Sequence, residues 1–217
     1  MGKCILIGAG DFTYQSGESV AVTEGDYVIA VDGGYTYCER LGIVPDLIVG
    51  DMDSLTDILQ EKIEELARTD PEKVIRLPCE KDDTDMRFAM KKGLEKGCQE
   101  FVLYGALGGR LEHTIANIQC LLYLKEQGVK ATIADEKYTV FLLKNETVSF
   151  AEESTGFFSL FALQKQASGV TIRGMKYPLE DVLLTEDFPL GISNEFIGEA
   201  AEITVREGTL LAIISKK

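Results

Sequence analysis

The sequence predicts an α/β fold with a mainly parallel sheet in its first part, followed by a small all-β sandwich or barrel. Up to Ala134, short apolar strands alternate with helical patterns, an order typical of a parallel sheet with helices on both faces. After about Glu136, short strand-like runs follow one another between Gly, Asn, Asp and Pro residues, without long helical patterns. We therefore expect two domains, residues 1–137 and 138–217.

The strands expected in the first part are short, apolar and rich in β-branched residues. They are residues 4–7, 28–31, 47–49, 74–77 and 101–103. A short helix is expected to end near Gly42, and a longer one, starting at Leu55 with Ser54 as its N-cap, is expected to end at Asp70. The strands expected in the second part are 138–143, 147–150, 157–161, 170–172, 182–184, 201–205 and 210–214.

Composition narrows the class of partner. The chain has 217 residues and a net charge of −14, which argues against a broad surface for nucleic acid or an anionic membrane. A single nucleotide stays possible, because a bound Mg²⁺ reverses the local sign of charge. The five cysteines form no C-x-x-C pair, and neither a signal peptide nor a membrane-spanning run is evident. We expect reduced thiols and a cytoplasmic protein.

Carboxylates follow two of the expected strands. Asp32 comes after strand 28–31, and Asp51 and Asp53 come after strand 47–49 and Gly50. In open α/β sheets, ligands bind at the carboxyl ends of the strands. An Asp in this place can simply cap a helix, but Ser54 is the better cap here, which leaves Asp51 and Asp53 for Mg²⁺.

Two further stretches, residues 8–11 and 81–85, carry candidate residues. Gly8-Ala9-Gly10-Asp11 is either a phosphate loop, lacking the third glycine of a dinucleotide fingerprint, or a tight turn. Thr84 is suited to cap the next helix, and Asp85 either favours that helix dipole or is a third metal ligand. Lys81 is a candidate phosphate contact.

The helix after Gly109 carries polar residues on one face. Arg110, His113, Thr114 and Asn117 share that face at helical spacing. Arg110 after a Gly-Gly pair suits a phosphate, or else a surface salt bridge, and the single histidine is either structural or an acid–base group. Later in the chain, residues 191–196 include Ser193-Asn194, which suits a small polar ligand or a turn.

Taken in order, these pieces resemble the thiamine pyrophosphokinase family. The residues that carry the resemblance are Asp32-Gly33-Gly34, Pro45-Asp46, Gly50-Asp51-Met52-Asp53-Ser54, Lys81-Asp82-Asp83-Thr84-Asp85, Gly108-Gly109-Arg110-Leu111-Glu112-His113, Asn117 and Ser193-Asn194. Glu112 stands where the family usually has Asp, and the family's first loop is not clearly recognisable in residues 8–17.

The resemblance implies a Rossmann-like domain that binds ATP, a C-terminal β domain that binds thiamine, and a homodimer that holds thiamine between its subunits. It implies that Asp51, Asp53 and Asp85 are the magnesium ligands and catalytic acids. It implies a nucleotide and phosphate site made of Asp32, Gly33, Gly34, Lys81, Asp82, Thr84, Gly109, Arg110 and His113. Ser193 and Asn194 would contact thiamine.

The reaction implied is transfer of the pyrophosphoryl group of ATP to the thiamine hydroxyl, which yields thiamine diphosphate and AMP. Two other readings of the residues stay open. One is an Mg²⁺-dependent nucleotidyl or pyrophosphoryl transferase with a different acceptor, and the other is a sensor that binds ATP and thiamine without turnover. The presence of all three candidate acids weighs against the sensor.

Overall fold

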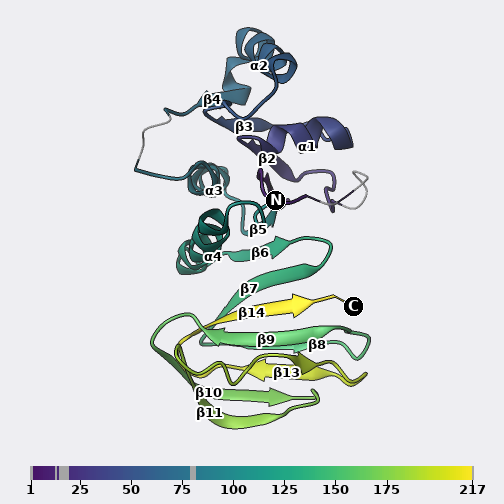
Figure 1. Cartoon of the computed structure of the whole chain (residues 1–217), viewed down its shortest axis with the longest axis vertical. Coiled ribbons are helices and arrows are strands. Elements are labelled where there is room, and N and C mark those ends of the chain that lie inside the picture. Colours follow the sequence, from purple (N-terminus) through teal and green to yellow (C-terminus); the bar gives the residue numbers. More distant parts are fainter. Residues whose placement is uncertain (1, 13, 15–19, 79–81, 217) are drawn as a thin grey trace. The chain divides into compact units, whose positions relative to one another are not determined.

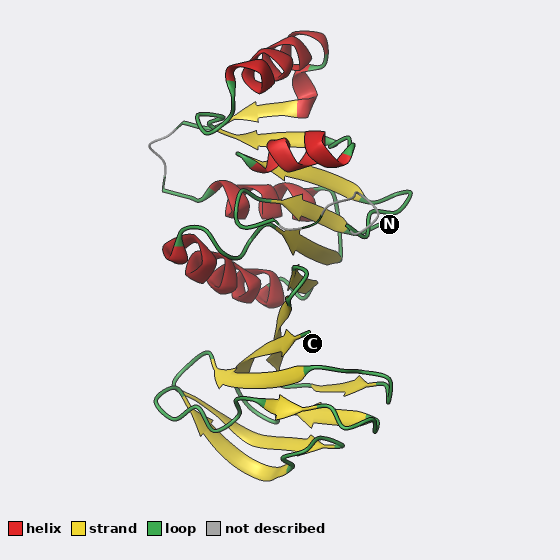
Figure 2. Ribbon diagram, turned by 45° about the vertical axis from the view of Figure 1, so that its right-hand side comes forward, coloured by secondary structure: helices red, strands yellow, loops and turns green. Residues whose placement is uncertain are grey.

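The computed structural model describes residues 2–12, 14, 20–78 and 82–216. The chain divides into two compact units, unit 1 being Met1–Asp135 and unit 2 Glu136–Lys217, so the division lies two residues before the expected boundary. Figure 1 labels the elements, and Figure 2 colours them by type. Among the described residues, no helix has the length and apolar character that crossing a membrane requires.

Unit 1 contains a parallel sheet. Its strands are β1 Cys4–Ile7, β2 Tyr27–Val31, β3 Leu47–Gly50, β4 Val74–Arg76, β5 Glu100–Tyr104 and β6 Lys130–Ala134. They follow the spatial order β6-β5-β1-β2-β3-β4 (Figure 1), and each neighbouring pair is parallel. The expected mainly parallel sheet is therefore confirmed.

Helices cover both faces of this sheet (Figure 2). The helices are α1 Gly34–Leu41, α2 Asp57–Thr69, α3 Asp85–Glu95 and α4 Leu111–Glu126, with a short 3-10 turn, η2 Pro71–Lys73. Ile5 and Ile7 share one buried cluster with residues of α1 and α2. Cys4 points to the opposite face, because a Cβ added to Gly93 of α3 would lie 2.6 Å from its Sγ atom.

The start of α2 differs from the sequence-based prediction. The helix begins at Asp57 with Thr56 at the N-cap position, so the prediction that Ser54 caps a helix starting at Leu55 is wrong. Leu55 is only 6% exposed and belongs to the core as part of the preceding turn, whereas Ile58 is 70% exposed. Burial of Leu55 by tertiary packing, rather than helical spacing, fixes where the helix starts.

The direction of the chain across the sheet reverses beside β1. From β1 the chain builds β2, β3 and β4 on one side, and then returns to place β5 and β6 on the other. The carboxyl ends of the adjacent strands β1 and β5 therefore lie at the point where the strand order reverses. In sheets of this kind, that point is where ligands bind.

Unit 2 is a β-sandwich. Its strands are β7 Tyr138–Lys144, β8 Thr147–Phe150, β9 Phe157–Ala162, β10 Gln166–Arg173, β11 Leu179–Thr185, β12 Asn194–Glu195, β13 Ala201–Thr204 and β14 Thr209–Ser215. The order is β12-β9-β14-β7 in one sheet and β11-β10-β13-β8 in the other, and the pairings are antiparallel. Phe158 and Leu160 of the first sheet share one buried cluster with Val170 and Ile172 of the second. The expected small all-β part is confirmed.

Candidate active site

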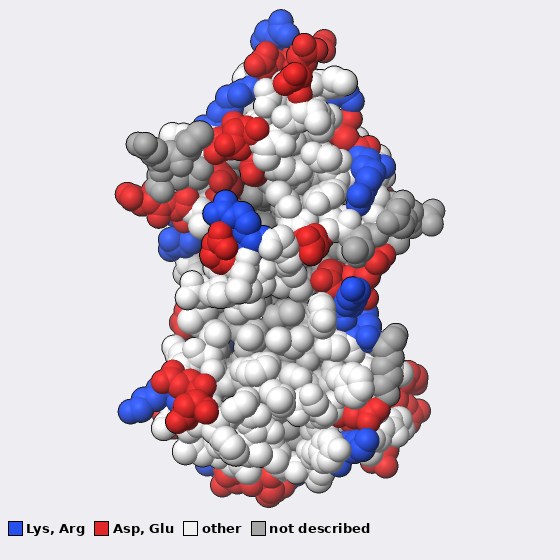
Figure 3. Space-filling view, in the orientation of Figure 1, with Lys and Arg blue, Asp and Glu red and all other residues white. Residues whose placement is uncertain are grey.

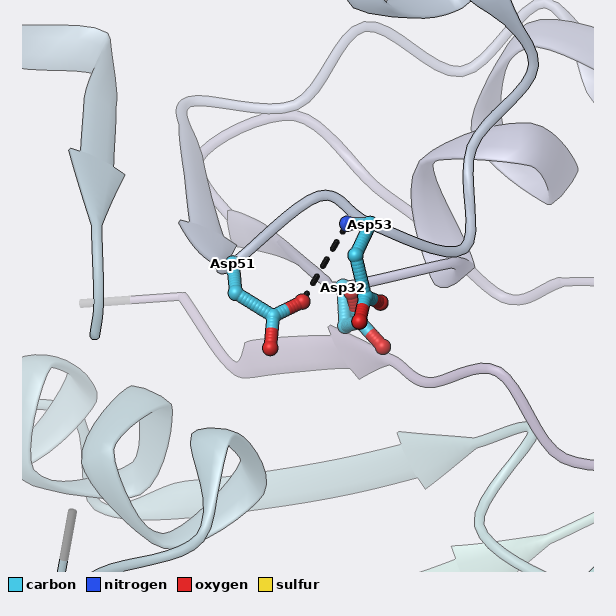
Figure 4. Close-up of side chains that lie close together, drawn as sticks. All are labelled: Asp32, Asp51 and Asp53. Carbon is cyan, nitrogen blue, oxygen red and sulfur yellow. Dashed lines mark hydrogen bonds between the residues drawn. The ribbon is translucent and has the colours of Figure 1, made fainter. Parts of the chain in front are cut away.

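Three carboxylates gather at the carboxyl ends of β2 and β3. One oxygen from each of Asp32, Asp51 and Asp53 lies within 4.8 Å of the others (Figure 4). Asp32 and Asp51 are half-buried, and Asp53 is exposed. The cluster therefore has a protected side in the protein and an open side toward solvent.

The pairing of β2 with β3 brings these residues together. Val31 is in register with Val49, and the Asp32 backbone N–H donates to the Val49 carbonyl oxygen over 2.7 Å. A Cβ at Gly50 would stand 2.8 Å from the Asp32 Cα atom, so a residue with a side chain would push the two strand ends apart. The sequence Val49-Gly50-Asp51 at the end of β3 thus allows the close approach of Asp51 to Asp32.

The backbone of the cluster is strained at two non-glycine positions. Asp32 has φ 51° and Met52 has φ 66°, both in the left-handed region. Such conformations cost about 1–3 kcal/mol each and persist where the surroundings fix them. Met52 is buried, and the Asp53 N–H donates to Asp51 Oδ1 over 3.2 Å (Figure 4). The turn therefore directs Asp51 and Asp53 to the same side.

The carboxylates disfavour one another's ionised form. Burial raises the pKa of Asp32, and the charges of Asp51, Asp85 and Asp53 raise it further. The pKa of Asp53 is raised first by a side-chain hydrogen bond with Asp51 and then by that neighbour's charge. A divalent cation would relieve this repulsion, and oxygen-only donors are those that Mg²⁺ prefers. The donor set therefore fits Mg²⁺.

Asp85, expected as a third metal ligand, is not one of the three clustered carboxylates. This half-buried residue lies outside the group of three carboxylates that a single ion could span, although its charge acts on Asp32 and Asp53. Its helix, α3, begins as predicted, because Thr84 Oγ1 accepts a hydrogen bond of 3.1 Å from the Arg87 N–H. The metal-ligand role of Asp85 stays a prediction.

The segment before α3 contains two more expected site residues. Lys81 lies outside the described residues, and Asp82 is exposed. Their neighbour Asp83 accepts hydrogen bonds from Lys91 and from the Thr84 N–H, and these bonds lower its pKa against the effect of burial. Asp83 thus anchors the start of the helix that carries Asp85.

The polar residues at the start of α4 fall into two groups: two bond to the preceding loop and two are exposed to solvent. Asn117 donates to the Ala106 carbonyl oxygen over 2.8 Å, and Thr114 donates to that of Gly108 over 3.3 Å, so both hold the preceding loop. Arg110 and His113 are exposed. Arg110 Nε donates to Glu112 Oε1 over 2.7 Å, which is an exposed ion pair of small energy that a phosphate can displace.

The two glycines after Asp32 are needed for packing. A Cβ at Gly34 would lie 1.9 Å from the Ile7 carbonyl oxygen, and one at Gly33 would lie 2.9 Å from Ser54 Oγ. Ser54 Oγ in turn donates to Asp32 Oδ1 over 3.4 Å, which is the role it has in place of the predicted helix cap. The glycines therefore bring α1, the end of β1 and the carboxylate cluster together.

The Ser193-Asn194 pair lies in unit 2. Ser193 is exposed, adopts φ 56°, and its N–H donates to Ser159 Oγ over 3.1 Å. Asn194 is only 3% exposed, and its amide bonds to the Tyr177 carbonyl oxygen and to the N–H groups of Tyr177 and Glu195. The bonds of the buried Asn194 side chain favour a structural role in residues 191–196. The Ser193 side chain is exposed and therefore accessible to a ligand.

Exposed apolar side chains accompany this segment. On the face drawn in Figure 3, the surface over unit 2 is largely uncharged, with acidic and basic groups at its edges. The large exposed apolar residues of this unit are Tyr138, Phe157, Tyr177, Leu183, Phe188, Leu190, Ile192 and Ile197. An exposed apolar surface of this kind is typical of an interaction or ligand site.

The sequence did not predict the roles of two residues of the site. Asp32, expected at the nucleotide, also belongs to the carboxylate cluster. A sequence signal for this role exists, because the neighbouring parallel strands β2 and β3 are each followed directly by an Asp. Asp11 bonds to the glycine loop after β5, with its Oδ1 atom accepting from the Gly109 N–H over 3.1 Å. No sequence pattern indicates that contact.

Comparisons with known proteins identify the family of this chain. The family models described as "Thiamin pyrophosphokinase, catalytic domain" and "Thiamin pyrophosphokinase, vitamin B1 binding domain" match residues 20–133 and 144–210. Thiamine pyrophosphokinase of Bacillus subtilis (strain 168) is 30% identical over 188 residues, which are 86% of this chain and 86% of that relative.

Solved structures have the same fold. The crystal structure of thiamine pyrophosphokinase from Bacillus subtilis has a TM-score of 0.86 at 24% identity, covering 99% of both chains. That from Geobacillus thermodenitrificans has a TM-score of 0.83 at 27% identity, covering 100% of this chain and 98% of the other. With both family models matched and the Bacillus subtilis relative covering most of its length, the chain belongs to the thiamine pyrophosphokinase family.

Proposed function

We propose that this enzyme transfers the pyrophosphoryl group of ATP to the hydroxyl of thiamine in a Mg²⁺-dependent reaction, yielding thiamine diphosphate and AMP. The observation that carries the proposal is the cluster of Asp32, Asp51 and Asp53 at the ligand-binding edge of the sheet. A phosphoryl transfer needs in-line positioning of the reactants and neutralisation of developing charge. The acids for a metal lie at this edge, and Arg110 follows the loop after β5 at the same edge.

The two units divide the substrates between them in this proposal. Unit 1 binds ATP, since it carries the carboxylate cluster and the glycine loops after β1 and β5. Unit 2 binds thiamine, through Ser193 and the segment that Asn194 shapes. The match of residues 144–210 to a family model named for vitamin B1 binding supports this assignment.

The residues that would hold Mg²⁺ are Asp32, Asp51 and Asp53, with Asp85 acting on the same ion directly or by its charge. When bound, Mg²⁺ supplies a positive charge that offsets the phosphate oxygens and fixes their orientation. The carboxylates would fix the position of the ion at the sheet edge. A carboxylate of this group near the thiamine hydroxyl is suited to accept its proton.

Cationic side chains complete the proposed phosphate site. Arg110 leaves its exposed pair with Glu112 and forms hydrogen bonds to phosphate oxygens, for which a guanidinium is well suited. Lys81, Asp82, Thr84 and His113 are assigned to the same nucleotide site on the sequence pattern. Holding both substrates together contributes an effective molarity equivalent to about 7 kcal/mol at best.

We further propose that the enzyme works as a cytoplasmic homodimer that holds thiamine between its subunits. Exposed apolar side chains at positions 188, 190, 192 and 197, close in sequence to Ser193, support a contact with another subunit, because exposed apolar surface favours association. The described cysteines at 4, 38, 98 and 120 are free and buried, which agrees with a reducing compartment.

The experiment that tests the proposed reaction identifies the nucleotide product. The protein is incubated with ATP, Mg²⁺ and thiamine, and the products are separated by chromatography. We expect one AMP for each thiamine diphosphate, and none without thiamine. ADP would instead indicate transfer of a single phosphoryl group, and binding of both ligands without any product would indicate a sensor.

A further inference from the structure

The glycine-rich loops after β1 and β5 are bonded to each other. We call residues 8–11 the first glycine loop and residues 105–110 the second glycine loop. The Gly10 N–H donates to the Gly105 carbonyl oxygen over 2.7 Å, and the Asp11 N–H donates to that of Leu107 over 2.8 Å. A Cβ at Gly10 would lie 2.4 Å from the Leu107 oxygen. The first loop thus forms a close backbone support for the second.

The Asp11 side chain continues this support to the end of the second loop. Its Oδ1 atom accepts a hydrogen bond of 3.1 Å from the Gly109 N–H. A Cβ at Gly108 would lie 2.2 Å from Asp11 Oδ2, so the Gly108 backbone rests against the carboxylate. Gly108 and Gly109 adopt φ 73° and 59°. Because glycine populates many conformations, an external bond is needed to hold this pair in one.

The first glycine loop is itself fixed from the side of α1. The Tyr37 hydroxyl donates to the Gly10 carbonyl oxygen over 2.8 Å, and the Tyr37 ring stacks on the Phe12 ring with 4.5 Å between the ring centroids. Arg40 Nη2 donates to the Phe12 carbonyl oxygen over 3.1 Å. Asp11 is therefore held between two anchored residues, and its carboxylate has a defined position from which to order the second loop.

We propose that Asp11 is a positioning residue for ATP: its carboxylate orders the Gly108-Gly109 turn and thereby sets Arg110, without contacting the nucleotide. The inference rests on the proposed function, which assigns Gly109 and Arg110 to the phosphate site. A loop that is ordered before binding loses less conformational freedom when the ligand arrives, so it binds more tightly. A direct contact of Asp11 with phosphate would be repulsive.

Two substitutions separate the hydrogen bond from the charge. Asp11→Asn keeps an Oδ1 acceptor for the Gly109 N–H and removes the charge, whereas Asp11→Ala removes both. Glu24→Ala is the matched control, because Glu24 is an exposed acid in the turn before β2, at the opposite end of that strand from Asp32. All three variants are made in the full chain.

Two measurements are made on each variant: hydrogen exchange of the Gly109 amide, and MgATP affinity by calorimetry together with kcat and KM. In Asp11→Ala we expect faster exchange at Gly109 and a rise of about three- to tenfold in the Kd and KM for ATP, as for one lost hydrogen bond. The KM for thiamine stays unchanged, and the Tm falls by about 1–6 °C, as for one lost hydrogen bond within the protein. In Asp11→Asn and Glu24→Ala, the Kd and KM for ATP stay within about twofold of the wild-type values, because both variants keep an acceptor for the Gly109 N–H.

Other outcomes overturn the proposal. Unchanged exchange at Gly109 in Asp11→Ala would mean that the carboxylate does not order the turn. Faster exchange with unchanged ATP affinity would mean that the order does not matter for the nucleotide. Equal damage from Asn and Ala would indicate a role for the charge itself. Wild-type protein that binds ATP but makes no AMP would refute the proposed reaction, while the exchange and affinity measurements still test Asp11.

Discussion

Replacing Asp32 with Asn is expected to make the metal-free protein more stable. Asn tolerates the left-handed backbone that Asp32 adopts, at φ 51°, and it keeps an oxygen for the Ser54 hydroxyl. The substitution removes one of the three negative charges in the cluster. The substitution therefore stabilises the folded protein in two ways. It removes the repulsion between Asp32 and the other two carboxylates, and it removes the cost of burying an ionised carboxylate.

The size of the effect follows from the distance between the carboxylates. One carboxylate oxygen from each of Asp32, Asp51 and Asp53 lies within 4.8 Å of the other two. At such a distance, two unit charges repel by about 0.9 kcal/mol in water and about 3.5 kcal/mol at an effective dielectric constant of 20. Because Asp32 and Asp51 are half-buried, solvent screens part of this repulsion, and we expect a gain of about 1–2 kcal/mol. That gain corresponds to a rise in Tm of about 2–8 °C.

The gain depends on pH with a definite sign. The pKa of Asp32 is raised in the folded protein by burial and by the neighbouring acids. The stability that its protonated form contributes is therefore lost as the pH rises through the folded pKa. The advantage of Asp32→Asn over wild type should be largest near neutral pH. It should shrink as the pH falls and Asp32 of the wild type takes up its proton.

The assay is thermal unfolding in EDTA over a series of pH values, with Asp187→Asn as the control. Asp187 is an exposed carboxylate of unit 2, so its substitution removes one charge from the chain without touching the cluster. Adding Mg²⁺ should stabilise wild type more than Asp32→Asn, because the variant has lost a ligand. A Tm for Asp32→Asn in EDTA equal to or below that of wild type would refute the reasoning.

Three further predictions concern other parts of the site. Asp51→Ala, Asp53→Ala and Asp85→Ala should each abolish thiamine-dependent AMP formation while leaving the circular dichroism spectrum unchanged; wild-type-like rates in all three would contradict the metal site. Gly34→Ala should destabilise the protein by several kcal/mol in urea unfolding, because its Cβ would stand 1.9 Å from a backbone oxygen at the end of β1; an unchanged midpoint would show that α1 shifts freely. Asn194→Ala should raise the KM for thiamine more than that for ATP and cost about 1–3 kcal/mol of stability, and an equal rise in both KM values would oppose its assignment to the thiamine segment.

The strands and the carboxylates after them were predictable from local sequence. Buried strands of a parallel sheet are short apolar runs, and the turns after them contain the Gly and Asp residues that stand out in composition. Asp32 and Asp51 are 19 positions apart, yet both follow such runs, so their meeting at one sheet edge follows from β2 pairing with β3. The gathering of carboxylates at this edge therefore follows from the sequence pattern.

The start of α2 could not be predicted in the same way. Ser54 and Asp57 fit a capping box, and Leu55 fits the helical spacing of apolar residues. In the fold, Leu55 is drawn into the core and Ser54 Oγ bonds to Asp32 from a different strand end. Tertiary packing thus overrides the local preference for a cap and delays the start of the helix by two residues.

The roles of Asp11 and Asn194 depend on contacts that are distant in sequence. Asp11 bonds to Gly109, 98 residues away, and Asn194 bonds to Tyr177, 17 residues away. Neither partner is indicated by spacing or composition, since an Asp or Asn in a loop most often bonds to its own neighbours. The strand order places β5 beside β1 and so brings Gly109 to Asp11, and an antiparallel bridge between Met175 and Phe196 brings Tyr177 to Asn194.

The central claim is that Asp32, Asp51 and Asp53 form the metal site, and Mn²⁺ binding tests it most directly. Mn²⁺ binds to the same oxygen ligands as Mg²⁺ and can be followed by its electron paramagnetic resonance signal. Wild-type protein and Asp51→Asn are titrated with Mn²⁺ in the presence of a non-hydrolysable ATP analogue. The account predicts a tight site in wild type that is lost or strongly weakened in Asp51→Asn. Equal Mn²⁺ affinity in the two proteins would contradict it.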